Sequence, residues 1–534
     1  MASVTRGGLG LGRIFQRKTV AQIQSELEHG ELKRTLGALN LVLLGIGCII
    51  GTGIFVLTGQ AAAQWAGPAI MVSFVITGVL CALVALCYAE LASALPVSGS
   101  AYSYTYASMG EIAAWVMGVL LLLEYGLAAS VVAVGWSGYF VSLLHDLHII
   151  IPPALTAAPG QAAVGAGGAM LAGVGIVNLP AICAIAAVTA LLVVGVSESA
   201  TVNNIVVAIK LTVVIAFIAI GSFFVHPAHW TPFIPAQIPA PPPGTPMDMP
   251  HQILRALWDV VTGNSHSRYG VGGVIHGAAV IFFAYLGFEA VSTAGAESRN
   301  PGRDMPIGIL GALIVCTVLY IATSAVLVGI VPYQSLDNPA PIATAVNQLG
   351  LPWFAALVKI GAIAGLSSVM LVLLYGQTRI FYTMSRDGLL PPALALVHKR
   401  FKTPWVNTII VGAMACFAAG FTSLHTLSEV TNVGSLAAFT MVCVTVIYLR
   451  ISNPEMVRPF RTPLFPLTPI LGAAMCVMLL MSLMAGEATR NFFLIYLGVG
   501  FVIYFFYGMW NSKLHKGVMV TGHEATPMEL PHNE

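Results

Sequence analysis

Long apolar stretches separated by short polar segments run through almost the whole 534-residue chain. A transmembrane helix needs about 20 consecutive apolar residues to cross the hydrocarbon core of a bilayer. On this measure the pattern predicts twelve transmembrane helices. They lie at about residues 36–63, 68–95, 112–144, 177–196, 203–225, 273–296, 306–331, 352–378, 406–421, 426–449, 467–485 and 492–511.

The composition agrees with a membrane location. Hydrophobic residues make up 57% of the chain and charged residues only 8%, whereas soluble domains carry about 25% charged residues. We therefore predict an all-α integral membrane protein. The net charge of +2 is too small to indicate a nucleic-acid partner. All eight cysteines fall within apolar stretches and none forms a CxxC pair, which argues against a disulfide framework or a metal site.

The distribution of lysine and arginine predicts the orientation in the membrane. With the N-terminus in the cytoplasm, the outer segments keep only Arg255, Arg268 and Arg490 of the basic residues. Both termini are therefore expected to be cytoplasmic, in a multi-pass protein of the plasma (inner) membrane. Two lysines, Lys210 and Lys359, lie inside predicted helices, and Lys359 is close enough to the outer end to extend to the interface.

We expect the chain to be organised in six consecutive segments. The N-terminal segment, residues 1–35, lacks the apolar core of a cleavable signal peptide. The segments are a cytoplasmic N-terminal segment (1–35), a first group of five helices (36–225), an extracytoplasmic proline-rich loop (226–271), a second group of five helices (272–450), two further helices (451–511) and a cytoplasmic C-terminal tail (512–534).

The first predicted helix contains four glycines within nine positions, namely Gly45, Gly47, Gly51 and Gly53. Each weakens a helix by about 1 kcal/mol relative to alanine. In lipid, a broken helix is tolerated only where its backbone contacts protein or lines a cavity. The glycines therefore predict a break at a binding site. The alternative is that they only allow neighbouring helices to pack closely.

The sixth predicted helix carries a second interruption, at Ile281–Ala290, where Gly287 and Glu289 lie among aromatic residues. The two interrupted helices are five helices apart. Because five is odd, the two groups of five helices would have opposite orientations in the membrane. This is the expectation for an inverted repeat whose binding site lies where the broken helices meet.

Several short motifs point to one protein family. They are Gly45–Phe55, Tyr88–Ser93, Gly99–Tyr102, Leu123–Tyr125, Asn203–Asn204 with Lys210, Phe283–Phe288, Glu297–Pro301 and Arg458–Arg461. With these motifs the sequence resembles the amino acid permeases of the amino acid–polyamine–organocation superfamily, and within it a bacterial member of the cationic amino acid transporter subfamily. The resemblance implies a leucine-transporter-like fold, with a five-plus-five inverted repeat and two extra C-terminal helices.

An amino acid offers a carboxylate and an ammonium group to a binding site. The backbone N–H groups of Gly51, Thr52 and Gly53 would open a half-helix whose positive end suits an anion. The resemblance implies that Ile49, Thr52 and Gly53 bind the carboxylate. The ammonium group would meet carbonyl groups freed at the second break, those of Phe283, Ala284 and Leu286.

Two charged residues within apolar stretches are expected to couple transport to protons. A lysine such as Lys210 at mid-membrane depth costs about 3 kcal/mol, and a buried amine loses its proton readily. In proton-dependent relatives a lysine on the fifth helix occupies the place of a cation in sodium-coupled ones. The alternative is that Lys210 extends to the membrane surface. Glu124 is a second candidate proton carrier, and its alternative is a salt bridge without proton traffic.

Other polar residues within the helices allow more than one interpretation. Glu289 would attract a positively charged group of the substrate or pair with a neighbouring helix, and Tyr285 is a possible gate. Ser367 and Ser368 would bind sodium or only pack against another helix. Glu90, at a cytoplasmic helix end, is expected to form an ion pair that acts as a gate or stabilises the fold.

No metal-binding spacing, nucleotide-binding loop or nucleophile–base arrangement is present in the sequence. We therefore expect no enzyme activity and no cofactor. The prediction is a secondary active transporter that imports amino acids by alternating access, coupled to protons. An exchanger without net proton movement and a non-transporting amino acid receptor are the alternatives. Expected partners are the substrate, protons and membrane lipid, with no obligate protein partner. The sequence leaves open whether the substrate is cationic or small and neutral.

Overall fold

The computed structural model describes residues 35–97, 99–164, 170–195, 200–239, 248–262, 268–514, 518–521 and 524–527. The expected N-terminal segment lies outside these residues except for its last position. Parts of the proline-rich loop and of the C-terminal tail also lie outside them.

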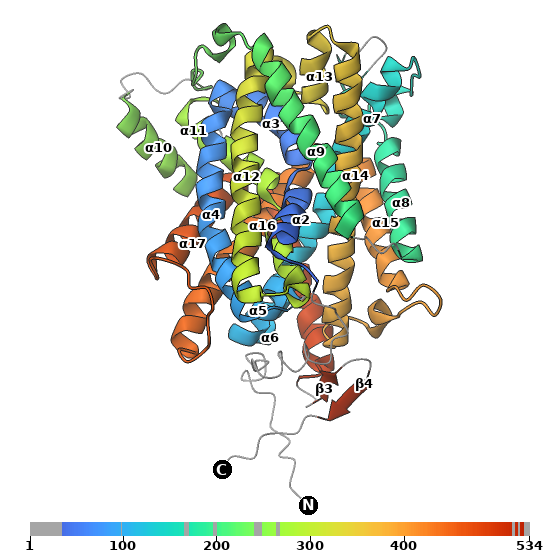
Figure 1. The fold of residues 1–534 in the computed structure, drawn as a ribbon, viewed down its shortest axis with the longest axis vertical. Helices are drawn as coiled ribbons and strands as arrows, with labels where there is room; N and C mark the ends of the chain where they lie inside the picture. Colours follow the sequence, from blue (N-terminus) through green and yellow to red (C-terminus); the bar gives the residue numbers. More distant parts are fainter. Residues whose placement is uncertain are drawn as a thin grey trace, which may run out of the picture.

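Helices dominate the described part of the chain and run mostly along its long axis (Figure 1). The α-helices are α2 (Ala38–Ile49), α3 (Thr58–Ala61), α4 (Ile70–Ala94), α5 (Ser100–Ser108), α6 (Glu111–Leu121), α7 (Ala128–Asp146), α8 (Leu179–Val194), α9 (Ala200–Gly221), α10 (Met249–Val261), α11 (Gly270–Ile281), α12 (Pro301–Ile330), α13 (Pro341–Gln348), α14 (Pro352–Arg386), α15 (Trp405–Phe421), α16 (Leu424–Ser452), α17 (Leu467–Met484), α18 (Glu487–Ile503) and α19 (Met509–Asn511).

Strands within the described residues are confined to two short antiparallel hairpins. In the first, β1 (Ala163–Val164) pairs with β2 (Met170–Leu171). In the second, β3 (Val518–Thr521) pairs with β4 (Glu524–Pro527). Both hairpins lie outside the predicted transmembrane helices, so the membrane-embedded part is helical as expected.

Nine helical segments of the described chain are long and apolar enough to cross a membrane. Three shorter apolar helices, α2, α8 and α15, lie at further predicted positions. Every predicted stretch therefore contains helix, although the count of twelve membrane crossings stays a prediction. The nine segments are Gly53–Ala94, Glu111–Asp146, Asn203–Phe224, Gly270–Glu297, Pro301–Ile330, Pro352–Arg386, Leu424–Ser452, Leu467–Met484 and Glu487–Asn511.

The interrupted helices lie in the interior of the bundle. Helix α2 packs against α12 and α9 and is enclosed between them (Figure 1). In the most apolar window of Gly270–Glu297, 89% of the residues are buried, compared with 22% for Glu487–Asn511 at the periphery. Helix α12 also packs along α4, while α14 packs along α7. Both predicted breaks are therefore surrounded by protein, as lipid requires of an interrupted helix.

Lys359 forms an ion pair that the sequence did not predict. Its side chain is fully buried and donates a hydrogen bond to Oδ2 of Asp146 at 2.6 Å, at the end of α7. The amine therefore reaches a carboxylate that is 42% exposed at the end of α7, and its extension to the membrane interface stays a prediction. Its charge is neutralised by a neighbouring helix, which sequence spacing alone does not reveal because the partners are 213 positions apart.

Glu90 of α4 forms an ion pair, as predicted. Its carboxylate accepts hydrogen bonds from Nε and Nη2 of Arg450 at 2.9 and 2.5 Å, and from the backbone N–H of Thr462 at 2.7 Å. Arg458 lies at 3.3 Å from the same carboxylate. These contacts join α4 to α16 and to the segment that follows α16.

Breaking this pair is expected to destabilise the protein. Glu90→Ala leaves Arg450 without its bidentate partner, and removing one member of a buried pair costs about 3 kcal/mol or more. We expect a clearly lower midpoint of thermal unfolding for the purified protein in detergent. Glu487→Ala is the control, because its exposed contact with Arg490 at 3.8 Å contributes little. Equal midpoints for the two variants would contradict this prediction.

Candidate functional site

The first break lies at Ile50 and Gly51. Helix α2 ends at Ile49, and Ile50 adopts an extended conformation with φ −73° and ψ 99°. Helical structure resumes at Thr52 and continues as a π-helical segment, Gly53–Leu57. The chain therefore leaves helical geometry for two residues inside the bundle and then returns to it.

The four glycines of this stretch have different neighbours. A Cβ atom at position 45 would lie 2.5 Å from Cβ of Ala312, and one at position 47 would lie 2.8 Å from Cγ2 of Val207. Gly45 and Gly47 thus allow α2 to pack closely against α12 and α9. Close packing, the alternative interpretation, accounts for these two positions, while Gly51 belongs to the break itself.

The second break follows α11. A short 3₁₀ segment, Phe282–Tyr285, leads to Leu286, which is extended with φ −59° and ψ 136°. Gly287 then adopts φ +115°, a conformation that is accessible to glycine and strained for other residues. The chain continues as a second 3₁₀ segment, Glu289–Glu297. The interruption predicted at Gly287 is therefore present.

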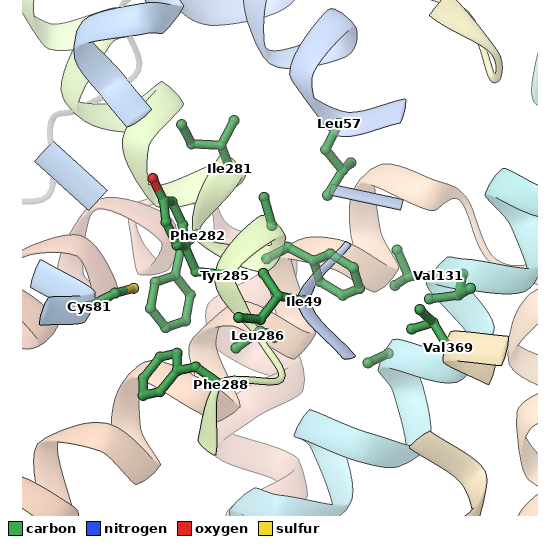
Figure 2. Packing of buried hydrophobic residues seen from close by; sticks show 14 of the residues in the cluster. Ile49, Leu57, Cys81, Val131, Ile281, Phe282, Tyr285, Leu286, Phe288 and Val369 are labelled. Carbon is green, nitrogen blue, oxygen red and sulfur yellow. The ribbon is translucent and has the colours of Figure 1, made fainter. Parts of the chain in front are cut away.

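The two breaks touch each other. A Cβ atom at position 53 would lie 2.1 Å from Cα of Ala284, and one at position 287 would lie 2.8 Å from the carbonyl carbon of Cys48. The missing side chains therefore let the two backbones meet directly. Figure 2 shows Ile49 and Leu286 at the centre of this region, with Val131 and Val369 to one side.

The predicted binding residues are brought together by this contact, and all of them are buried: Ile49, Gly51, Thr52, Gly53, Phe283, Ala284 and Leu286. The first backbone groups of a helix lack partners within the helix. The N–H of Phe55 donates to the carbonyl of Gly51 at 3.3 Å, so helical bonding resumes only beyond Gly53. The hydroxyl of Thr52 is fully buried and has no hydrogen-bond partner within the described residues.

An orphaned hydroxyl beside the opening of a helix is a position where a ligand oxygen would complete the hydrogen bonding. Gly135 of α7 faces Thr52, since a Cβ atom there would lie 3.2 Å from the Thr52 hydroxyl oxygen. The first break, where the sequence predicts an anion, thus has a buried hydroxyl without a partner among the described residues.

The second break provides acceptors. The carbonyl of Phe283 already accepts a hydrogen bond from the N–H of Leu286 at 3.2 Å, but a carbonyl oxygen has a second lone pair. Tyr285, the possible gate, donates its hydroxyl to the carbonyl of Phe74 at 2.9 Å and is fully buried. In this conformation its hydroxyl is thus engaged with α4.

Lys210 reaches the first break from α9. It is fully buried, and its Nζ donates to the carbonyl of Gly47 at 2.7 Å, in the last turn of α2. Gly365 of α14 makes room for the lysine stem, with 3.1 Å between a Cβ atom placed there and Cγ of Lys210. The side chain therefore lies in the interior and does not extend to the membrane surface.

Glu124 and Glu289 lie next to each other. Glu124 is in the π-helical segment Leu122–Leu127, and its carboxyl faces that of Glu289. Neither carboxyl oxygen of Glu124 accepts a hydrogen bond from a donor among the described residues. Glu289 accepts from the N–H of Gly287 at 2.8 Å and from the hydroxyl of Tyr125 at 3.4 Å. Neither carboxyl is paired with a lysine or arginine of the described chain.

Ser367 and Ser368 are engaged within α14. The Ser367 hydroxyl donates to the carbonyl of Ile363 at 2.8 Å and accepts from Trp136 Nε1 at 2.9 Å. The Ser368 hydroxyl donates to the carbonyl of Gly365 at 3.0 Å. These bonds are those expected for helix packing. Among the described residues, no group of three or more His, Cys, Asp or Glu side chains is arranged to hold a metal ion.

Sequence reasoning missed two tyrosines that hold the first broken helix. The hydroxyl of Tyr320 donates to the carbonyl of Ile49 at 2.8 Å, and that of Tyr139 donates to the carbonyl of Phe55 at 2.6 Å. Tyr320 thus satisfies a backbone carbonyl before the break, and Tyr139 satisfies one after it. Their only signal in the sequence is a phenol inside a predicted membrane helix, where its hydroxyl needs a partner.

The similarity to known proteins covers both breaks and the helices around them. Residues 36–506 match the profile of a family described as amino acid permease. The chain belongs to the amino acid permease family. The permease is 44% identical to the methylthioribose transporter of Bacillus subtilis (strain 168), over 95% of this chain and 100% of that protein. It is 42% identical to the branched-chain amino acid permease BcaP of the same organism, with the same coverage.

A plant relative is more distant. The permease is 36% identical to the vacuolar cationic amino acid transporter 4 of Arabidopsis thaliana, over 83% of this chain and 68% of that protein. The family and these relatives identify the chain as a transporter rather than an enzyme. Together with the apolar helices they identify a multi-pass membrane protein. The resemblance to amino acid permeases inferred from the sequence motifs is therefore confirmed.

Proposed function

We propose that this permease is a secondary active transporter that imports amino acids across the plasma membrane by alternating access and couples this import to protons. The observation that carries the proposal is the direct contact between Gly53 and Ala284. It brings the N–H groups at the first break close to the carbonyl groups at the second, which supports a site for an anion beside a site for a cation. An α-amino acid carries both charges on neighbouring atoms.

Each substrate group has its own set of residues in this proposal. The carboxylate binds the N–H groups of Gly51, Thr52 and Gly53, beside Ile49. The ammonium group binds the carbonyl groups of Phe283, Ala284 and Leu286. Lys210 and Glu124 carry protons, because both are buried within membrane helices and lie beside the breaks.

The proposed membrane arrangement has twelve crossings, with both termini in the cytoplasm. Gly67 supports the division of Gly53–Ala94 into two crossings, because its φ of +60° and ψ of −147° end the helical geometry there. Helix α2 and the segment after the first break then form one interrupted crossing. The groups 36–225 and 272–450 are the two halves of an inverted repeat, related through the two breaks.

For the substrate we favour an amino acid with a neutral, apolar side chain. Val131 of α7 and Val369 of α14 are buried, are seen to one side of Ile49 in Figure 2, and would form an apolar wall. The name of BcaP, which denotes branched-chain amino acids, agrees with such a wall. The plant relative is named for cationic amino acids, and the carboxyls of Glu124 and Glu289 would favour that alternative.

A second candidate substrate is methylthioribose, named in the Bacillus relative at 44% identity. It is an uncharged sugar thioether, so it would use neither the anion site nor the cation site. Competition by amino acids therefore separates the two possibilities. An amino acid substrate should be displaced by other α-amino acids but not by their decarboxylated amines, which lack the group that binds at Gly51–Gly53.

The test is uptake into liposomes that contain only the purified permease. A thermal-shift screen of the twenty amino acids and methylthioribose selects ligands, and each labelled ligand is then offered with and without an inward proton gradient. We expect an amino acid to accumulate above its external concentration, and a protonophore to abolish this accumulation.

The other outcomes identify the alternatives. Counterflow without net uptake into empty liposomes would indicate an exchanger. Binding without flux in either direction would indicate a receptor. Accumulation that is indifferent to the proton gradient would overturn the coupling.

A further inference from the structure

Beside the second break lies a pair of carboxyl groups whose surroundings contain several unsatisfied polar atoms. The pair consists of Glu124 and Glu289, each 1% exposed. Near it, the hydroxyl of Tyr88 has no hydrogen-bond partner within the described chain. The same holds for both amide atoms of Gln377, which is fully buried on α14. Buried polar atoms in native proteins nearly all have partners, so these atoms keep hydrogen-bonding capacity beside the carboxyl pair.

Gln377 belongs to this region through its packing. A Cβ atom at position 126 would lie 3.9 Å from the amide oxygen of Gln377, and one at position 376 would lie 3.2 Å from the ring of Tyr125. Helix α14 thus rests on the π-helical segment that carries Glu124. The orphaned amide lies against the same turn as the orphaned carboxyl.

Glu289 controls the geometry of the second break through one peptide group. Its Oε2 accepts the N–H of Gly287 at 2.8 Å. That N–H belongs to the same planar peptide as the carbonyl of Leu286, and in a trans peptide the two groups point in opposite directions. Holding the N–H therefore aims the Leu286 carbonyl away from Glu289. This carbonyl is one of the proposed acceptors for the substrate ammonium.

The charge of the pair has no counter-ion within the described chain. The titratable groups facing it are the hydroxyls of Tyr88 and Tyr125 and the thiol of Cys81. Two ionised carboxylates side by side without a cation repel each other strongly in a buried site. A single proton removes this repulsion, because a protonated Glu124 becomes a donor to the carboxylate of Glu289.

We propose that Glu124 and Glu289 share one transported proton and that this proton sets the orientation of the Leu286 carbonyl. With the proton present, Glu289 stays on the Gly287 N–H and the ammonium site is formed. When the proton leaves, the carboxylates separate, the Gly287 N–H loses its acceptor and the ammonium site loosens. Proton and substrate therefore bind together and leave together. This inference rests on the proposed function, and it assigns Glu289 as a positioning residue.

Substitutions at Glu289 separate its two roles. In Glu289→Gln the amide oxygen still accepts the Gly287 N–H, so we expect substrate affinity to stay within about 3-fold of the wild type while its pH dependence is lost. In Glu289→Ala the acceptor is gone, and loss of a charge-assisted bond weakens substrate binding by about 10-fold or more. Glu124→Gln should lose the pH dependence as Glu289→Gln does, and the double variant should resemble either single one.

The measurement is substrate affinity of the purified permease across pH, with counterflow and proton-driven accumulation in liposomes beside it. The two glutamine variants should keep counterflow and lose proton-driven accumulation. Glu429→Gln is the matched control, because Glu429 is also buried and accepts a hydroxyl hydrogen bond, from Thr489 at 2.7 Å, at the start of α16. It should behave as the wild type.

Two results with the variants would overturn the shared proton. One is a pH dependence of affinity that persists in either glutamine variant, and the other is additive effects in the double variant. If the wild type binds substrate but shows no flux, the transport proposal fails, while the affinity data still show whether Glu124 and Glu289 share a proton.

A measurement on the wild type alone does not depend on how the variants fold. Infrared difference spectra across pH should show the carbonyl band of one protonated buried carboxyl, and its absence at every pH would also overturn the proposal.

Discussion

Gly53→Ala is expected to abolish saturable substrate binding and transport. The added Cβ atom would lie 2.1 Å from Cα and 2.4 Å from Cβ of Ala284. Because the nearest atoms include backbone, no side-chain rotation relieves this clash, and the two breaks must move apart. Overpacking of this kind typically costs 1–3 kcal/mol of stability. The larger effect is on function, since a displacement of about 1 Å in a positioned site lowers activity on the order of 100-fold.

The measurement combines ligand-induced thermal shift with uptake into liposomes. Gly498→Ala is the matched control, because nothing lies within 4 Å of a Cβ atom at that position of α18. Gly51→Ala is the graded case, since its Cβ atom would meet Val369 at the ordinary contact distance of 3.4 Å. A monodisperse Gly53→Ala protein that binds substrate with wild-type affinity would show that the contact between the breaks does not form the site.

The four glycines show which features of the first break the sequence predicts and which it does not. A cluster of glycines in an apolar stretch predicts an interrupted helix, because the cost to helix formation is intrinsic to the residue. Which glycine packs and which one breaks the helix depends on the facing residues. Gly45 and Gly47 meet Ala312 and Val207, partners separated from them by more than a hundred positions. One sequence without its fold does not identify such neighbours.

At the second break, too, one feature was predictable from the sequence and another was not. Its location was predictable from Gly287 and the carboxylate two positions later. The contact between Glu289 and the Gly287 N–H is local and agrees with that spacing. The proximity of Glu124 to Glu289 was not predictable, because it depends on how the π-helical segment Leu122–Leu127 is turned toward the break. Likewise, the proposed apolar wall for the substrate side chain consists of valines of α7 and α14, which carry no distinguishing pattern in the sequence.

Lys210→Met is expected to abolish proton-driven accumulation while leaving substrate counterflow in place. Methionine keeps much of the length and volume of the stem that packs against Gly365 but removes the charge and the hydrogen bond to the Gly47 carbonyl. That carbonyl lies in the last turn of α2, directly before the first break. With the amine gone, the end of α2 no longer responds to a proton. Uptake of labelled substrate with and without an inward proton gradient measures the loss.

The two proton sites then make different contributions, and Lys210→Met separates them. The carboxyl pair acts on the second break and sets substrate affinity, so the pH dependence of affinity should persist in Lys210→Met while accumulation is lost. Lys359→Met is the matched control, because Lys359 is equally buried but is paired with Asp146 at the end of α7. It should lower stability and leave the accumulation ratio unchanged. Wild-type accumulation by Lys210→Met would reduce Lys210 to a structural link between α9 and α2, and would leave the carboxyl pair as the sole proton carrier.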